Sequence, residues 1–233
     1  MIRRMPSRAR HRWFGFLLSL VVPGLGQAWS RRASSLIWFA AAIIVLLVPS
    51  PWGPLLWFVL AAASAREAMR FLGGRPRVPH HVLVNYTKGR VDLVTSVDVP
   101  WARERAWEFV SDVPRFGAID PFHDEVHLCA DGSLILDHCV FGIPVMRVGR
   151  ILHWHEGRGY AFSDLSVRGP RCGFPHVFFI SLETLGPKTT RLQVRVRGKW
   201  TARWLPPIAV RAWLRLVAGQ HGRLLAASIP VAA

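Results

Sequence analysis

Residues 190–200 read TRLQVRVRGKW, and this stretch predicts the fold class more directly than any other. Apolar side chains stand at Leu192, Val194 and Val196, with Trp200 in the same phase, and polar side chains occupy the positions between them. Because successive side chains of a β-strand point to opposite faces, the alternation predicts a strand with one buried and one solvated face.

Upstream of this strand, further runs have strand character, and turn signals separate them. The turn signals are Asp131-Gly132, Gly142, Glu156-Gly157, Gly169-Pro170 and Gly186-Pro187. The predicted strands are 91–99, 125–129, 133–141, 144–155, 159–166, 175–184 and 190–200.

Two helical segments are predicted, one after the first strand and one after the last strand. Pro100 opens the first over 101–110, where Ala102, Ala106, Phe109 and Val110 form an apolar stripe at helical spacing, and Asp98 is a capping signal. Pro206-Pro207 opens the last helix, which runs over 207–228. One face of this helix contains Val210, Trp213, Leu214, Val217, His221 and Leu224. The order predicts an α+β domain over 90–229, in which a curved antiparallel sheet surrounds a long C-terminal helix.

This domain resembles the SRPBCC, or START-like, superfamily, which includes polyketide cyclases, aromatases and lipid-transfer domains. The residues that carry the resemblance are Val97-Asp98-Val99-Pro100, the helical segment 106–113, Phe116 and Asp120-Pro121-Phe122, followed by the strand segments 150–154, 160–162 and 190–192. The resemblance implies a helix-grip fold with an apolar cavity, closed at one mouth by the last helix.

The first third of the chain differs in charge. Residues 1–90 hold 13 lysines and arginines against one acidic residue, whereas residues 91–233 hold 17 against 13. Residues 13–29 and 33–65 contain no charged side chain. We therefore predict an α-helical transmembrane anchor over 1–72, with apolar segments at about 13–29, 33–48 and 55–71, and a linker over 73–89.

The anchor has alternatives. Residues 3–28 also imitate a secretory signal, but the second apolar run that follows at once favours an anchor. The segment 13–29 contains Pro23-Gly24-Leu25-Gly26, so it is either a kinked span or a re-entrant hairpin. The stretch 17–27, followed by Arg31-Arg32, resembles small bacterial membrane proteins with a PGLGQ signature. Arginines flank both ends of the anchor and none lies in 49–54, which predicts a bacterial inner membrane location with the C-terminal domain in the cytoplasm.

Strand phase predicts which side chains line the cavity. Large apolar side chains at alternate positions either fill a core or line a pocket. The candidate ligand-binding residues are Phe116, Phe122, Met146, Trp154, Tyr160, Phe162, His176, Phe178, Ile180, Trp213 and Val217. We predict that the domain binds a hydrophobic small molecule or lipid, with a cyclase-like or dehydratase-like enzyme as the alternative.

No catalytic residue, metal or cofactor is predicted. His153 and His155 share a strand face, but the sequence places no third ligand beside them. Acid/base chemistry from Asp120, Asp124 and Glu125 near His123 and His127 competes with a solvated loop. An enzyme needs a polar group with a perturbed pKa inside the cavity, and His138, His176 and His221 have the required phase. The three cysteines, Cys129, Cys139 and Cys172, are interpreted as small hydrophobic residues.

The net charge of +16 raises the question of an anionic partner. Most of the excess lies in the flanks of the predicted anchor, so we do not expect binding to nucleic acid. The predicted partners are the lipid bilayer and a hydrophobic ligand. Anionic lipids of the inner leaflet are a further candidate partner for an outward row on the last strand, which comprises Arg191, Arg195, Arg197 and Lys199.

Overall fold

The computed structural model describes residues 18–23, 34–47, 52–72, 76–140, 143–166, 174–202 and 205–230. The chain divides into two units, of which the first comprises residues 1–74 with 139–143 and the second comprises the remaining residues. Each unit is described by itself.

The first unit contains two helices, α3 (Ser34–Leu47) and α4 (Gly53–Leu72). They correspond to the segments predicted at 33–48 and 55–71. Among the described residues, no helix combines the length and the apolar character needed to cross a membrane. At 1.5 Å per residue, the 14 residues of α3 extend over about 21 Å, against a hydrocarbon core of about 30 Å. The predicted spans are therefore not confirmed, and most of the segment 13–29 lies outside the described residues.

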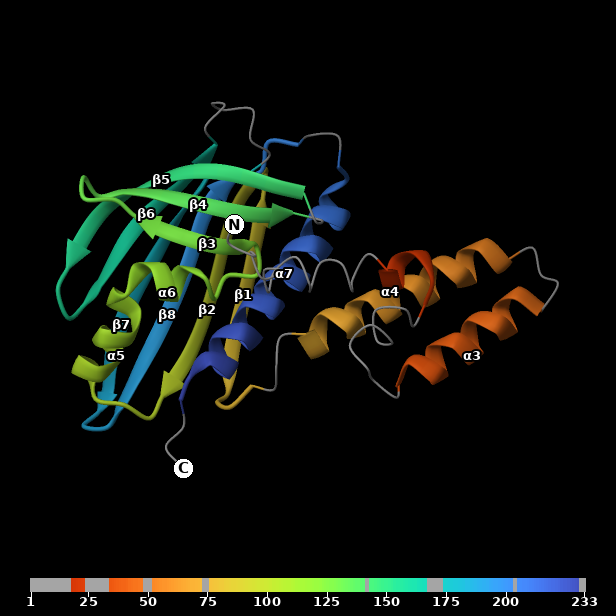
Figure 1. Cartoon of the computed structure of the whole chain (residues 1–233), viewed down its shortest axis with the longest axis horizontal. Coiled ribbons are helices and arrows are strands. Elements are labelled where there is room, and N and C mark those ends of the chain that lie inside the picture. The colour runs from red at the N-terminus through yellow and green to blue at the C-terminus, as the bar shows by residue number, and fades with distance from the viewer. Residues whose placement is uncertain are drawn as a thin grey trace, which may run out of the picture. The chain divides into compact units, whose positions relative to one another are not determined.

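The second unit is a curved antiparallel sheet of eight strands with a long C-terminal helix, the arrangement of a helix-grip fold (Figure 1). The spatial order is β1-β2-β8-β7-β6-β5-β4-β3. The strands are β1 (His80–Thr87), β2 (Arg90–Val99), β3 (His123–Leu128), β4 (Ser133–Val140), β5 (Ile143–His155), β6 (Gly159–Ser166), β7 (His176–Gly186) and β8 (Thr189–Lys199).

Strand β1 corrects the predicted domain boundary. The linker predicted over 73–89 overlaps this strand, because residues 80–87 pair with β2 in a continuous antiparallel register from His80↔Val97 to Thr87↔Arg90. The segment HHVLVNYT alternates between half-buried and exposed residues because β1 is an edge strand of the sheet.

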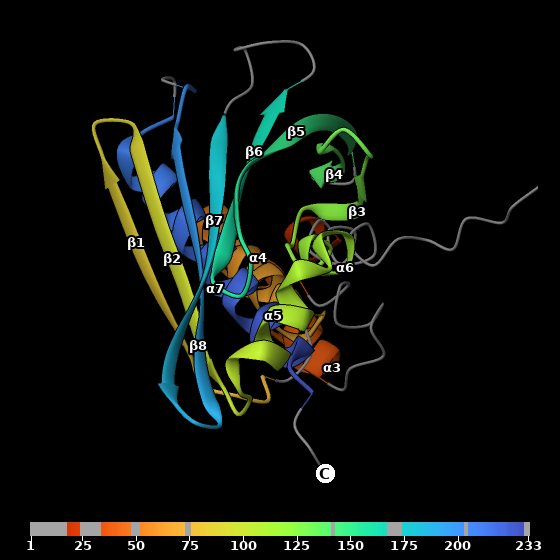
Figure 2. The same ribbon diagram turned by 90° about the vertical axis from the view of Figure 1, so that its left-hand side faces the viewer.

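The helices of this unit lie inside the curve of the sheet (Figure 2). The short helices α5 (Arg103–Ser111) and α6 (Val113–Gly117) connect β2 to β3, and α7 (Pro207–Ser228) contacts β1 and β2. The predicted Asp98 cap is wrong: α5 is preceded by Ala102 with no side-chain cap, and Asp98 pairs with Arg191 instead. Asp112 caps α6 by accepting a hydrogen bond from the Arg115 backbone N–H.

The buried face of α7 agrees with the predicted one in most positions. Val210, Leu214, His221 and Leu224 are buried as predicted, whereas Trp213 and Val217 are only half-buried. Gly222 marks the closest approach to the sheet, because a Cβ atom there would lie 2.7 Å from the His80 ring and 3.0 Å from Val82. The absence of a side chain at this position lets the helix approach β1 and β2 closely.

Opposite charges pair on the outer face of β2 and β8. Arg191 donates two hydrogen bonds to the Asp98 carboxylate at 2.8 and 3.1 Å, and Arg195 donates two to the Asp92 carboxylate at 2.7 and 2.5 Å. Arg197 Nε lies 3.6 Å from Asp92 Oδ2. Two carboxylates thus offset part of the charge of the four-residue row predicted to face anionic lipid, which weakens the attraction of this row to a membrane surface.

These pairs predict a loss of stability in acid. The hydrogen bonds from Arg195 and Arg191 lower the pKa of Asp92 and Asp98 in the folded state. The resulting stabilisation is present above the unfolded-state pKa of about 4 and is lost as the pH falls through the lower folded-state values. In urea unfolding at pH 2 to 6, the double variant Asp92→Asn/Asp98→Asn should depend less on pH than the wild type does. An unchanged pH dependence would contradict this role.

A buried hydrogen bond joins α5 to the sheet. The Tyr160 hydroxyl donates to the Val110 carbonyl oxygen at 2.8 Å, and burial raises the pKa of Tyr160 so that the hydroxyl remains protonated. Tyr160→Phe leaves the carbonyl without this donor and should lower the free energy of unfolding by about 1–2 kcal/mol. Chemical denaturation measures this change. Tyr86→Phe on the edge strand is the control, and an equal loss in both variants would contradict the assignment.

Candidate functional site

A small pocket lies between the sheet and helices α6 and α7. Its free volume is about 10 Å³, room for about one water molecule. Most of the residues that line the pocket are apolar, and three are polar. The lining residues are Phe116, Gly117, Asp120, His123, Phe162, Phe178, Ile180, Val194 and His221.

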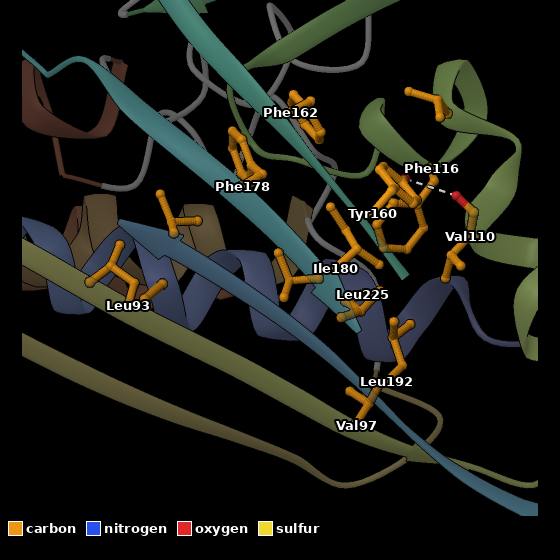
Figure 3. Close-up of a cluster of buried hydrophobic side chains, with 14 of the residues drawn as sticks. Leu93, Val97, Val110, Phe116, Tyr160, Phe162, Phe178, Ile180, Leu192 and Leu225 are labelled. Carbon is orange, nitrogen blue, oxygen red and sulfur yellow. Dashed lines mark hydrogen bonds between the residues drawn. The ribbon is translucent and has the colours of Figure 1, made fainter. Parts of the chain in front are cut away.

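Three adjacent strands supply the apolar wall. Phe162 on β6 pairs in register with Phe178 on β7, and Ile180 on β7 pairs with Val194 on β8, so all four side chains point to the concave face. The rings of Phe162 and Phe178 are stacked, with centroids 4.7 Å apart (Figure 3). The polar side chains come from other elements: Asp120 follows α6, His123 begins β3 and His221 lies on α7.

The structure brings four of the candidate residues together in this pocket: Phe116, Phe162, Phe178 and Ile180. Tyr160 is buried in the same core, and His176 lies beside Phe178 with ring centroids 5.0 Å apart. The pocket also contains His123, Asp120 and His221. The sequence pattern made these three polar residues candidates for catalysis but not for ligand binding.

The other candidates lie elsewhere. Met146 is 57% exposed and Trp154 43% exposed. Met146 and Arg147 are neighbours on β5, so Met146 points outward while Arg147 points inward. The register of β5 with β6 shifts between Ile151 and His153. The predicted phase therefore does not hold along β5: Trp154 pairs with Tyr160 and stacks on its ring at 5.1 Å, whereas Met146 points outward. Phe122 and Trp213 are half-buried with centroids 6.2 Å apart, and Val217 is half-buried.

A cluster of buried polar residues adjoins the pocket, and we call it the Asp164 cluster: His123, His138, Arg147, Asp164 and His176. The Asp164 side chain has no exposed surface. Its Oδ2 atom lies 3.1 Å from His138 Nε2, 3.2 Å from His176 Nε2 and 3.9 Å from His123 Nε2. Its Oδ1 atom lies 2.5 Å from Arg147 Nε. One guanidinium group and three imidazole rings therefore surround the Asp164 carboxylate.

Sheet register positions the cluster. His123 and His138 are directly opposite on β3 and β4, and Asp164 and His176 are directly opposite on β6 and β7. Side chains of directly opposed residues lie on the same face of a sheet. Arg147 on β5 also donates to the backbone carbonyl oxygens of Asp164 and Phe174, at 3.0 and 3.2 Å. These hydrogen bonds hold the guanidinium group on the Oδ1 side.

The rings of His123 and His176 are fixed by backbone carbonyl groups. His123 Nδ1 donates to the Gly117 oxygen and His176 Nδ1 donates to the Phe174 oxygen, both at 2.8 Å. A carbonyl oxygen carries no proton, so each Nδ1 atom must be the protonated nitrogen. The Nε2 atoms of both rings are directed toward Asp164.

Burial and charge shift the pKa values in opposite directions. Burial alone would lower the pKa of His123, but the Asp120 and Asp164 carboxylates outweigh it and raise this pKa. Burial lowers the pKa of His138 and of His176. Burial opposes ionisation of Asp164, but the surrounding histidines hold its pKa well below the ordinary range. Asp164 is therefore an ionised carboxylate, consistent with its ion pair to Arg147.

Asp164 and Arg147 are not among the site residues predicted from the sequence. A signal for Asp164 is present, since it follows Tyr160 and Phe162 at alternate positions and thus points inward with them. Arg147 gave no comparable signal, because the register shift in β5 breaks the phase that its neighbours would set. The three histidines judged to be in phase, His138, His176 and His221, all have buried side chains, and the first two contact Asp164.

Comparison with known proteins gave matches among solved structures alone. No protein-family model matches the sequence. No curated protein matches it either. A START superfamily protein from Mycobacterium smegmatis has 17% identity and a TM-score of 0.48, over 59% of this chain and 96% of that chain. The Zhui aromatase/cyclase from Streptomyces sp. R1128 has 19% identity and a TM-score of 0.47, over 59% of this chain and 91% of that chain. Likenesses this distant do not assign a function to the chain.

Proposed function

We propose that the C-terminal domain binds a hydrophobic small molecule or lipid in the pocket between the sheet and α7. The observation that carries the proposal is the composition of the wall. Phenylalanine and aliphatic side chains from three strands surround a few convergent polar groups, which is the usual composition of a small-molecule site. The apolar wall supplies affinity, and Asp120, His123 and His221 orient a polar end of the ligand.

The pocket must widen to admit such a ligand, because its present volume holds about one water molecule. The residues between α6 and β3, together with α7, form the side of the pocket that does not belong to the sheet. We propose that these elements move outward while the paired strands keep their register.

Native mass spectrometry of the purified full chain, followed by extraction with organic solvent, tests the binding. We expect an apolar compound to be retained and recovered. The matched variant is Val194→Phe, which adds a ring to the wall of the pocket and should release the compound. Leu83→Phe, at a 70% exposed position on the edge strand, is the control and should retain it. Absence of any retained apolar compound, or equal retention in both variants, would contradict the proposal.

A cyclase-like or dehydratase-like activity on an apolar substrate is the second candidate function. The observation that favours it is the presence of two buried histidines in the lining of the pocket, His123 and His221. Burial opposes protonation of His123, but Asp120 and Asp164 raise its pKa, whereas burial lowers the pKa of His221. Perturbed titratable groups in a pocket are typical of catalytic sites. His221→Gln tests this function, since His221 lines the pocket without contacting Asp164. An enzyme should then accumulate a chemically different bound compound, whereas a binding protein should retain the same one.

We also propose that the N-terminal region tethers the domain to the bacterial inner membrane, with the domain in the cytoplasm. The support is the arginine distribution and the large apolar side chains that α3 exposes, including Leu36, Ile37 and Leu46, which are 71–72% exposed. Large exposed apolar patches mark contact with membranes or proteins. A reporter fused after Ala233 should be active only inside the cell and should sediment with membranes. A reporter signal from outside the cell, or a freely soluble fusion, would contradict this proposal.

A further inference from the structure

Three donor atoms of the Asp164 cluster lie in the arrangement of a metal site. His123 and His138 each offer a ring nitrogen and Asp164 offers a carboxylate oxygen, these three atoms lie within 4.8 Å of one another, and all three residues are buried. His123 Nε2, His138 Nε2 and both Asp164 carboxylate oxygens lack a hydrogen-bond partner of good geometry among the described residues. Buried polar atoms are almost always satisfied, so this group of unsatisfied atoms needs an explanation.

The hydrogen bonds of the histidine Nδ1 atoms show which ring nitrogens carry a proton and which are free to accept one or to bind a metal ion. His123 and His176 each donate Nδ1–H to a backbone carbonyl oxygen, which places the lone pair of the neutral ring on Nε2. Both Nε2 atoms are directed at the same Asp164 oxygen, which is itself an acceptor. A cation must separate these acceptors, and it is either a proton on the rings or a metal ion between them.

We propose that the Asp164 cluster binds a divalent transition-metal ion through His123 Nε2, His138 Nε2 and Asp164 Oδ2, with His176 Nε2 as a fourth donor. The donor separations bracket those expected for such an ion. Two donors bound at 2.0–2.2 Å in tetrahedral geometry lie about 3.3–3.6 Å apart. The observed distances from Asp164 Oδ2 to the histidine Nε2 atoms are 3.1, 3.2 and 3.9 Å.

The surroundings of the donors also fit. Metal-binding histidines usually donate their other ring N–H to a carbonyl oxygen or a carboxylate, and metal-binding carboxylates are themselves hydrogen-bonded. His123 and His176 have the first feature, and Arg147 forms an ion pair with Oδ1 of Asp164 while Oδ2 faces the rings. Imidazole and carboxylate donors suit Zn²⁺, Fe²⁺ or Cu²⁺ rather than Mg²⁺ or Ca²⁺. The charge of Arg147 opposes a second cation, so we expect weaker binding than in a closed structural zinc site.

Burial distinguishes this cluster from two other groups of residues whose side chains could bind a metal ion. Glu125, His127 and Asp137 also form a group of three, but the first two are exposed and a solvated charge cluster explains them. His153 and His155 have ring centroids 4.3 Å apart and are exposed. This second pair provides a matched control, because it offers two neighbouring imidazole rings without a buried carboxylate.

Metal uptake by the untagged full chain tests the proposal. The protein is dialysed against a chelator, then against buffer, and titrated with Zn²⁺ and separately with Co²⁺. We expect one equivalent of zinc to remain after gel filtration, by elemental analysis, and Co²⁺ to give visible absorption bands of low-coordinate cobalt. The midpoint of thermal unfolding should rise with the logarithm of Zn²⁺ concentration. Absence of stoichiometric uptake would mean that protons occupy the rings, and would overturn the proposal.

Variants locate the ion. His138→Gln should weaken Zn²⁺ binding by more than about tenfold, since even partners outside the coordination shell contribute about 10–100-fold. The control His153→Gln/His155→Gln should bind Zn²⁺ as the wild type does. The reverse pattern would overturn the assignment. If His138→Gln fails to fold, the histidine ring resonances of the wild type decide the matter by NMR: Zn²⁺ must shift His123 and His138 and leave His153 unchanged. These readouts require no apolar ligand, so their failure would leave the proposed function untouched.

Discussion

Phe178→Ala is expected to lower the free energy of unfolding by about 3–5 kcal/mol, the usual loss for a buried phenylalanine. Phe178 is 5% exposed, and its ring lies 4.7 Å from Phe162, 5.0 Å from His176 and 5.9 Å from His123 by centroid distance. Truncation removes a ring from the centre of the sheet and leaves a cavity beside the Asp164 cluster. Urea unfolding followed by circular dichroism measures the change.

Phe179→Ala is the matched control for this prediction. Phe179 is the next residue on β7, points to the opposite face and is 39% exposed, so its loss should be much smaller. Equal losses in the two variants would contradict the assignment of faces. A ligand refines the prediction: if Phe178 lines an occupied pocket, its truncation costs less stability and changes which compound is retained. A large loss with unchanged retention would assign Phe178 to the core alone.

Asp164→Asn is expected to lower the free energy of unfolding by about 3–5 kcal/mol, the usual effect of removing one partner from a buried ion pair. The substitution preserves the shape of the side chain but leaves the Arg147 guanidinium without its carboxylate partner at Oδ1. It also removes the negative charge that His138 and His176 approach within 3.1 and 3.2 Å. Unfolding in the presence of a chelator measures this loss independently of any metal ion.

Two controls isolate the buried charge. Asp98→Asn breaks an ion pair whose side chains are more than one-third exposed, and exposed pairs contribute less than about 1 kcal/mol. Adding Arg147→Met to Asp164→Asn should recover part of the loss, because the uncompensated cation is removed as well. Equal losses for Asp164→Asn and Asp98→Asn would contradict the account of Asp164 as the centre of a buried cluster.

Most of the fold of the C-terminal domain was predictable from the sequence. The alternation in 190–200 and the turn signals placed β3 to β8 within a few residues, and α7 begins and ends at the predicted positions. These elements carry local information, namely side-chain periodicity and turn residues. The edge strand β1 was missed because glycine and proline precede it and neither of its faces is fully buried.

The site was predictable only in part. The apolar wall follows from phase along single strands, so Phe162, Phe178 and Ile180 were identified. The Asp164 cluster depends on which strands are neighbours and in which register, and it joins residues from β3, β4, β5, β6 and β7. A single strand does not contain that information. The register shift in β5 further misplaced Met146 and hid Arg147.

The central claim is that the pocket beneath α7 takes up an apolar ligand. Calorimetric titration of the full chain with the compound recovered by extraction tests it most directly, because burial of apolar surface on binding gives a negative heat-capacity change. The account predicts one saturable site with a negative heat-capacity change in the wild type, unchanged by Leu83→Phe and abolished by Val194→Phe. A saturable heat that Val194→Phe leaves intact, or no saturable heat in the wild type, would contradict it.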